Sequence, residues 1–202
     1  MRTIAYLCFV LAAAGTVWGQ DGFFRPMKGS ATPEFETSND SGRCLVFGKN
    51  IVKTTRSEDG GENVQLWHRE GTAKGMDACE LRKKPYATIN DSDNNSFYGI
   101  SAVYFFIDQG TSSGSRTLVV YKTGVGDQVT SVDYFANSAD PRIEAARYLY
   151  YDALSNKKGA VCKEAAKFKR MGGSVGWVQG KKMDLDDQTI ANVGGLRCTY
   201  ME

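Results

Sequence analysis

Residues 97–135 read FYGISAVYFFIDQGTSSGSRTLVVYKTGVGDQVTSVDYF, and this stretch decides the fold class that the sequence predicts. Its first part, residues 97–108, is rich in aromatic and β-branched side chains, as expected of a central strand buried on both faces. Residues 109–115 have the composition of a turn, and residues 117–121 predict a strand that returns antiparallel to the first. A further glycine-rich turn leads into a third strand over residues 129–135. The pattern indicates an antiparallel β-meander.

Short strands are also predicted on both sides of this meander. Upstream, residues 44–47 and 51–53 flank a turn, and residues 64–68 alternate between apolar and polar side chains. Downstream, residues 175–178 and 196–200 have the composition of closing strands. These segments extend the predicted sheet toward both ends of the chain.

Two helices are predicted between the meander and the closing strands. Asp140 followed by Pro141 is typical of a helix N-terminus. Apolar side chains then recur at helical spacing, namely Ile143, Ala146, Tyr150 and Leu154. A second helix is predicted over residues 159–170, where a pair of glycines would end it. The sequence therefore predicts an α+β fold, in which a helical pair covers one face of an antiparallel β-sheet.

The N-terminal residues 1–19 are typical of a secretory signal peptide. A basic start is followed by an apolar run and by small or branched residues up to Gly19, where cleavage is expected. The apolar run is shorter than the roughly 20 residues that cross a bilayer, so no transmembrane segment is expected in the mature chain. Residues 20–42 predict a flexible N-terminal arm. Residues 43–202 are expected to form a single disulfide-stapled domain.

Cleavage after Gly19 would leave four cysteines in the mature chain, which are Cys44, Cys79, Cys162 and Cys198. An even number of cysteines in an exported chain predicts two structural disulfides. Of the three possible pairings, Cys44–Cys79 with Cys162–Cys198 is slightly favoured because it gives two separate loops of similar size. No two of these cysteines are closer than 35 positions, whereas zinc sites commonly use local pairs. Neither a metal site nor a cofactor is therefore predicted.

Three asparagines match the acceptor pattern for N-glycosylation, namely Asn39, Asn90 and Asn94. Together with the signal segment and the cysteines, they predict a secreted extracellular glycoprotein, or a periplasmic protein if the chain is bacterial.

Catalytic candidates are few. The chain has one histidine, His68, which excludes mechanisms that need two histidines from one chain. His68 beside a carboxylate could act as a general base, although a half-buried strand end explains it equally well. Ser174 lies in the sequence GGSVG, which matches the G-x-S-x-G pattern of a nucleophile elbow. That elbow needs a strand before the serine and a helix after it, the reverse of the predicted order. Both residues are therefore weak candidates.

Residues 91–95 place oxygen ligands at the first, third and fifth positions of a calcium-binding loop. The pattern then fails, because Ser96 replaces the glycine at the sixth position and Ala102 replaces the glutamate at the twelfth. A solvated loop is the better interpretation. The acidic cluster within residues 184–187 could likewise be either a calcium-binding loop or a solvated loop.

Charge is unevenly distributed, although the totals of 25 basic and 23 acidic residues nearly cancel. Residues 157–182 carry eight basic residues and one acidic residue, a net charge of +7, so the rest of the mature chain carries about −6. On the second predicted helix, Lys163, Lys167 and Arg170 form one stripe. The stripe lies opposite the predicted apolar face of that helix, formed by Val161, Ala165 and Phe168.

This stripe is the predicted binding surface, suited to an acidic glycan, an anionic lipid surface or an acidic protein. A solvated polar face of the helix is the alternative interpretation. Nucleic acid is not expected, since the chain is nearly neutral and carries no nucleic-acid-binding motif. Tyr148 and Tyr150 are expected to lie far apart around the first helix, with one of them exposed as a contact residue.

These observations predict a secreted, non-enzymatic binding protein that engages an anionic partner through a basic helix. The leading alternative is a secreted hydrolase that uses His68 with a carboxylate. A structural component of the extracellular matrix is the third possibility. The single histidine and the lack of an intact catalytic motif favour binding over catalysis, without excluding an enzyme.

Overall fold

Several segments of the chain alternate between apolar and polar side chains, and this period of two residues is typical of strands with one buried face, whereas others are continuous runs of aromatic and β-branched residues. The computed structural model describes residues 24–71, 73–81, 83–159 and 161–202. Within these residues the chain forms thirteen β-strands, one short α-helix and one short 3₁₀ helix, η1 (Gly75–Cys79). The predicted signal segment, residues 1–19, lies outside the described residues.

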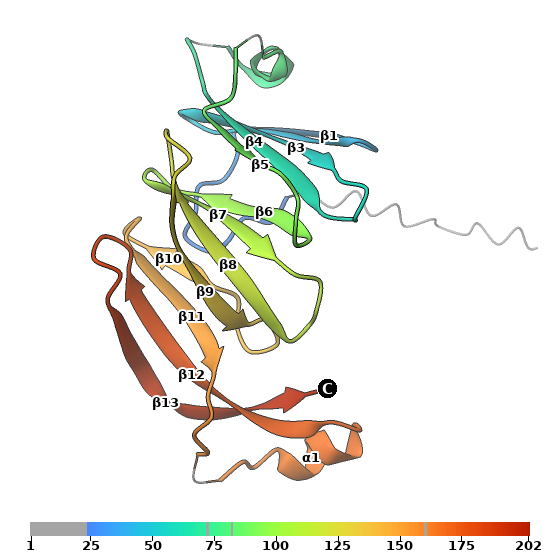
Figure 1. Cartoon of the computed structure of the whole chain (residues 1–202), viewed down its shortest axis with the longest axis vertical. Helices are drawn as coiled ribbons and strands as arrows, with labels where there is room; N and C mark the ends of the chain where they lie inside the picture. The colour runs from blue at the N-terminus through green and yellow to red at the C-terminus, as the bar shows by residue number, and fades with distance from the viewer. Residues whose placement is uncertain (1–23, 72, 82, 160) are drawn as a thin grey trace, which may run out of the picture.

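The strands form three antiparallel sheets, in each of which a strand pairs with its neighbours in sequence. The first sheet contains β1 (Phe35–Asn39), β2 (Gly42–Val46), β3 (Asn50–Arg56), β4 (Glu62–His68) and β5 (Ala87–Ile89). The second contains β6 (Asn95–Ile100), β7 (Tyr104–Gln109), β8 (Ser115–Lys122) and β9 (Gln128–Phe135). The third contains β10 (Arg142–Glu144), β11 (Tyr148–Leu154), β12 (Ser174–Asp184) and β13 (Ile190–Met201). Figure 1 shows the three sheets following one another along the long axis of the molecule.

The second sheet is covered on both faces because its strands are apolar on both sides. Phe105 and Ile107 of β7 pack with side chains of the first sheet, such as Leu66. Phe106 points to the opposite side and packs with side chains of the third sheet, such as Leu149. All five side chains are fully buried, and each contributes about 1.5–3 kcal/mol relative to an exposed position. The middle strand β7 therefore links the two main parts of the core.

The aromatic run of residues 97–108 forms two strands instead of the single strand predicted. β6 ends at Ile100, β7 begins at Tyr104, and the two strands pair antiparallel. The turn between them forms at Ser101, whose hydroxyl oxygen accepts the backbone N–H of Tyr104 at 3.0 Å. Serine side chains compete with regular secondary structure in this way, and a run of apolar residues conceals the effect.

The α+β prediction is wrong, because the fold is mostly β and the helical pair is not found in the described residues. Residues 140–154, predicted as the first helix, form β10 and β11. Ala145 and Ala146, in the turn between these strands, have φ values of +51° and +50°, outside the range of a right-handed helix. Tyr148 and Tyr150 lie on one face of β11, and the side chains between them lie on the other. Apolar residues spaced by three and four positions fit a helical period, and the sequence does not show that the chain turns at Ala145 and Ala146 between two strands.

Only part of the second predicted helix is helical, namely α1 (Ala165–Arg170). No side chain of α1 is buried, and six residues are too few for an isolated helix to be stable in water. Its conformation must therefore depend on contacts with the rest of the third sheet.

Residues 24–42, which belong to the segment predicted as a flexible arm, are built into the fold. Phe24 stacks on Phe97 of β6 with ring centroids 5.4 Å apart. Met27 is buried in the core between the second and third sheets, and its N–H donates to the carbonyl of Tyr98 at 2.8 Å. β1 then forms the edge of the first sheet. This segment runs along the stacked sheets, where its apolar side chains fill gaps.

Two disulfides are present, Cys44–Cys79 and Cys162–Cys198, which is the pairing favoured by the sequence. Two such bridges indicate an oxidising compartment, since thiols stay reduced in the cytosol. None of the helices in the described residues is long and apolar enough to cross a membrane.

Candidate functional site

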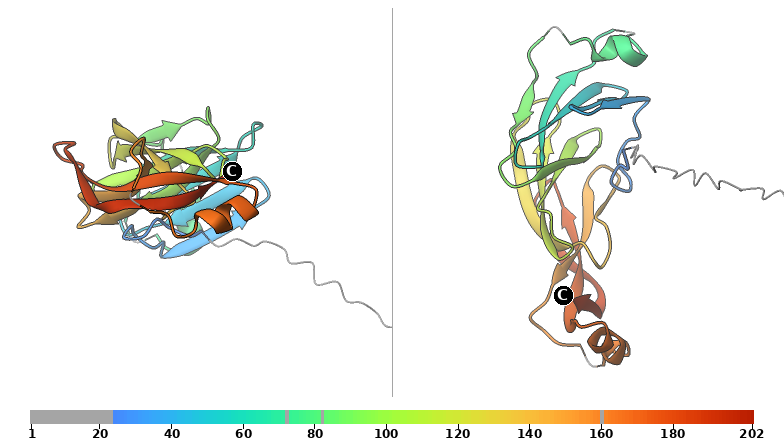
Figure 2. Two further views of the ribbon diagram at one scale, coloured as in Figure 1. Left: turned by 90° about the horizontal axis from the view of Figure 1, so that it is seen from below. Right: turned by 90° about the vertical axis from the view of Figure 1, so that its right-hand side faces the viewer.

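The cationic segment predicted as a binding surface lies at one end of the long axis of the molecule (Figure 1). We define the terminal lobe as residues 155–159, 161–178 and 197–202. It consists of α1 with its flanking turns and of the paired ends of β12 and β13, where Trp177 lies opposite Cys198. Figure 2 shows the lobe projecting beyond the stacked sheets.

Small residues let the helical segment approach the β12–β13 hairpin closely. Trp177 lies against Gly159, where an added Cβ would overlap the indole ring. Gly173 lies against Tyr200, and a Cβ there would overlap both the phenol ring and a backbone carbonyl oxygen. Phe168 of α1 contacts Tyr200 edge-on, with ring centroids 5.9 Å apart. These contacts form the half-buried apolar base of the terminal lobe.

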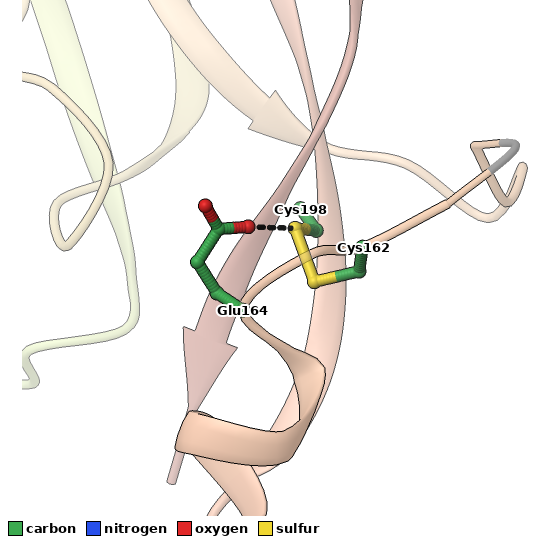
Figure 3. Close-up of a disulfide and its surroundings, with 3 residues drawn as sticks. All are labelled: Cys162, Glu164 and Cys198. Carbon is green, nitrogen blue, oxygen red and sulfur yellow. Dashed lines mark hydrogen bonds between the residues drawn. A yellow bond between two sulfur atoms is a disulfide. The ribbon is translucent and has the colours of Figure 1, made fainter.

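The disulfide Cys162–Cys198 ties the same segment to β13 (Figure 3). One carboxylate oxygen of Glu164 lies 3.4 Å from the Sγ atom of Cys198. The two sulfur atoms and this oxygen lie within 4.8 Å of one another, a spacing that would suit a metal ion if both sulfurs were thiolates. Because both sulfurs are bonded to each other, the cluster is a covalent tie and not a metal centre.

Six basic residues lie in the same segment of the chain as Cys162, and all of them are exposed: Lys157, Lys158, Lys163, Lys167, Lys169 and Arg170. Glu164 is the one acidic residue between positions 157 and 173, so the segment carries a net charge of +5. Among the described residues, none of the six basic side chains forms an ion pair. Elsewhere in the described residues, six arginines are paired with carboxylates, whereas Arg56 of β3 is not; the six are Arg43, Arg69, Arg116, Arg142, Arg147 and Arg197. An anionic partner would therefore meet cations that are not already neutralised.

The structure brings the three predicted stripe residues to this lobe, although not all to one helix. Lys163 precedes α1, whereas Lys167 and Arg170 lie within it. Val161, predicted on the buried face of the helix, is instead 75% exposed, and Met171 at the end of α1 is 55% exposed. The sequence pattern missed Val161 as a surface residue because it extended the helix back to residue 159, and it made no prediction for Met171.

His68, the weak catalytic candidate, lines a cavity of about 350 Å³ on the first sheet. Its ring packs against Tyr86 with centroids 4.6 Å apart, and burial raises the pKa of the Tyr86 phenol to about 12. Acidic side chains also line this cavity, namely Glu70, Asp77 and Glu80. Within the described residues no side chain forms a hydrogen bond with His68, so the structure supplies no oriented carboxylate partner for a general base.

Ser174 is exposed and is the first residue of β12. α1 precedes it and a strand follows it, which is the reverse of a nucleophile elbow. It lies in the third sheet, whereas His68 lies in the first, toward the other end of the molecule (Figure 1). The structure does not bring these two residues together.

A row of cations and tyrosines on the third sheet was not found by sequence reasoning. The guanidinium carbon of Arg142 lies 4.3 Å from the ring centroid of Tyr150. The Nζ atom of Lys182 lies 3.8 Å from the ring centroid of Tyr148. Arg147 donates to the carboxylate of Asp184 at 2.6 Å, and this hydrogen bond holds the pKa of Asp184 below its usual range. The signal that could have found the row is the strand alternation of Tyr148 and Tyr150. Because each ring is already covered by a cation, the row is largely self-paired.

The remaining polar candidates lie in turns. Burial raises the pKa of Asp91, but hydrogen bonds from Ser57 and from neighbouring backbone N–H groups outweigh it, and the pKa lies below its usual range. That carboxylate closes the loop itself instead of presenting its oxygens to an ion. The predicted glycosylation sites Asn39 and Asn90 are exposed, and Asn94 is half-buried. Glycosylation at these positions stays a prediction.

No family model matches the chain, and neither the curated proteins nor the solved structures include a significant match to it. The functional argument therefore rests on the residues and geometry of this molecule.

Proposed function

We propose that the chain is an exported, non-enzymatic binding protein whose terminal lobe contacts an anionic partner. The observation that carries the proposal is the set of six exposed basic side chains without ion-pair partners among the described residues. The signal-like segment and the two disulfides support export.

The construction of the lobe favours binding over a merely solvated face. A disulfide, two close glycine contacts and an aromatic pair fix a segment that has no buried side chain in its helix. A preorganised cationic surface loses less conformational entropy on binding than a flexible one would. Each basic side chain near an anionic surface contributes about 1 kcal/mol of attraction, which salt screens over a Debye length of about 8 Å at physiological ionic strength.

Heparin, a soluble polyanion, tests the proposal. We expect Lys163→Glu with Lys167→Glu to weaken heparin binding at least about tenfold, because four units of charge change at the lobe. The matched control is Lys49→Glu with Lys122→Glu, which makes the same change at exposed positions of the first and second sheets. Equal weakening by both pairs would show that only net charge matters and would overturn the assignment of the lobe.

The two other functions predicted from sequence have less support. A hydrolase using His68 has a cavity to work in, but the described residues supply no hydrogen-bonded carboxylate for the imidazole. No particular contact favours a structural component of the extracellular matrix. The hydrolase and the matrix component both stay predictions.

A further inference from the structure

We infer that the anionic partner of the terminal lobe is a lipid membrane, which the lobe meets end-on with Val161 and Met171 entering the interface. The inference rests on the proposed function and names the chemistry of its partner. Two features of the lobe favour a membrane over a soluble polyanion or an acidic protein, namely its exposed apolar side chains and its shape.

The first feature is the combination of apolar and basic side chains. Val161 and Met171 are more than half exposed, on a surface with a net charge of +5 between residues 157 and 173. Met171 directly follows α1, and its side chain is exposed like those of Lys167 and Arg170, whereas Phe168 is half-buried against Tyr200. Apolar side chains set among lysines and arginines are typical of protein surfaces that lie in an anionic lipid interface.

A glycan or an acidic protein surface would be recognised by the charges without need of Val161 or Met171. In a membrane, by contrast, the apolar side chains enter the acyl boundary while the lysine and arginine head groups stay among the lipid phosphates. The charges and the apolar side chains then act together, and neither alone gives firm attachment.

The second feature is shape and position. The lobe forms a projecting end of an elongated molecule, as the right-hand view of Figure 2 shows. Five cavities of the described chain are lined by residues outside 157–173. A projecting tip of this kind fits a flat surface, whereas an elongated polymer or a peptide is usually held in a groove.

Co-sedimentation with vesicles tests the inference, with phosphatidylserine–phosphatidylcholine vesicles compared with vesicles of phosphatidylcholine alone. The decisive variant is Val161→Ser with Met171→Ser, which removes apolar surface and keeps every charge. Its matched control is Met76→Ser with Val125→Ser, the same two residue types, 57% and 56% exposed, in η1 and in the turn after β8. All four positions are exposed, and circular dichroism with thermal unfolding verifies that both variants fold.

We expect the lobe variant to bind the anionic vesicles about tenfold more weakly than the wild type, and the control to bind like the wild type. Heparin binding should be unchanged in both variants, because neither alters a charge. Equal vesicle binding by the two variants, or wild-type binding to heparin without binding to anionic vesicles, would overturn the membrane assignment. Neither result would touch the proposed function, which fails only if Lys163→Glu with Lys167→Glu binds heparin as the control Lys49→Glu with Lys122→Glu does.

Discussion

The two disulfides close loops of nearly equal length but lie in different surroundings, so their removal separates loop entropy from packing. The sequence separations are 35 for Cys44–Cys79 and 36 for Cys162–Cys198. In the chain-entropy model a loop of this size contributes about 4 kcal/mol to the free energy of unfolding, and the two values are equal within error. Any difference between the two bridges must therefore come from packing.

Packing differs strongly between the two sites. Cys44 and Cys79 are 5% and 8% exposed and belong to an apolar cluster that includes Ile51 and Trp67. Cys162 and Cys198 are only half-buried. Replacing both buried cysteines by alanine removes two sulfur atoms from that cluster, each comparable to a methylene group, which adds about 2 kcal/mol including the cavity. We therefore expect a loss of about 6 kcal/mol for Cys44→Ala with Cys79→Ala and about 4 kcal/mol for Cys162→Ala with Cys198→Ala.

Urea unfolding followed by circular dichroism and by tryptophan fluorescence measures both losses. Trp67 lies in the cluster around the first bridge, and Trp177 lies opposite Cys198 in the terminal lobe, so each bridge has a reporter. In the mature chain expected after cleavage at Gly19, which lacks Trp18, Trp67→Phe or Trp177→Phe leaves a single tryptophan that assigns the signal. The reasoning would be refuted if removal of Cys162–Cys198 lowered the free energy of unfolding as much as, or more than, removal of Cys44–Cys79. This comparison requires that the dependence of that free energy on urea concentration be the same in both variants.

Two further predictions concern the core and the pH dependence of stability. Phe106→Ala should lower the free energy of unfolding by about 3–5 kcal/mol in urea titrations, because Phe106 is fully buried between two sheets. A loss below about 1 kcal/mol would contradict the layered core. Arg147 holds the pKa of Asp184 below its ordinary value of 3.8, so the charged form is favoured on folding and the pair stabilises the protein above about pH 4. The difference in thermal midpoint between wild type and Asp184→Asn should be largest near about pH 6 and shrink as the pH falls below about 4, and a constant difference would argue against the ion pair.

Much of the strand structure could be predicted from local sequence, because many strands carry either an alternation or a run of β-branched and aromatic residues, and several turns contain glycine or serine. Residues 117–121 and 129–135 lie within strands of the structure, and the favoured disulfide pairing is present. The errors fall where local signals are ambiguous. Ile143, Ala146 and Tyr150 follow a helical period in the sequence, whereas in the structure Ile143 and Tyr150 lie on different strands. The positive φ values at Ala145 and Ala146, which turn the chain between those strands, have no mark in the sequence.

For the terminal lobe, too, some features were determined by the sequence and others only by the tertiary structure. The sequence by itself determined the excess of basic residues in residues 157–182 and the presence of Cys162 within that segment. Only the tertiary structure decided that the segment is mostly not helical, that Val161 and Met171 face solvent, and that the lobe projects from one end of the molecule. The physical reason is that the segment has too few apolar residues to fix its own conformation. Its shape is set by contacts with Trp177, Cys198 and Tyr200, which lie on the paired strands β12 and β13.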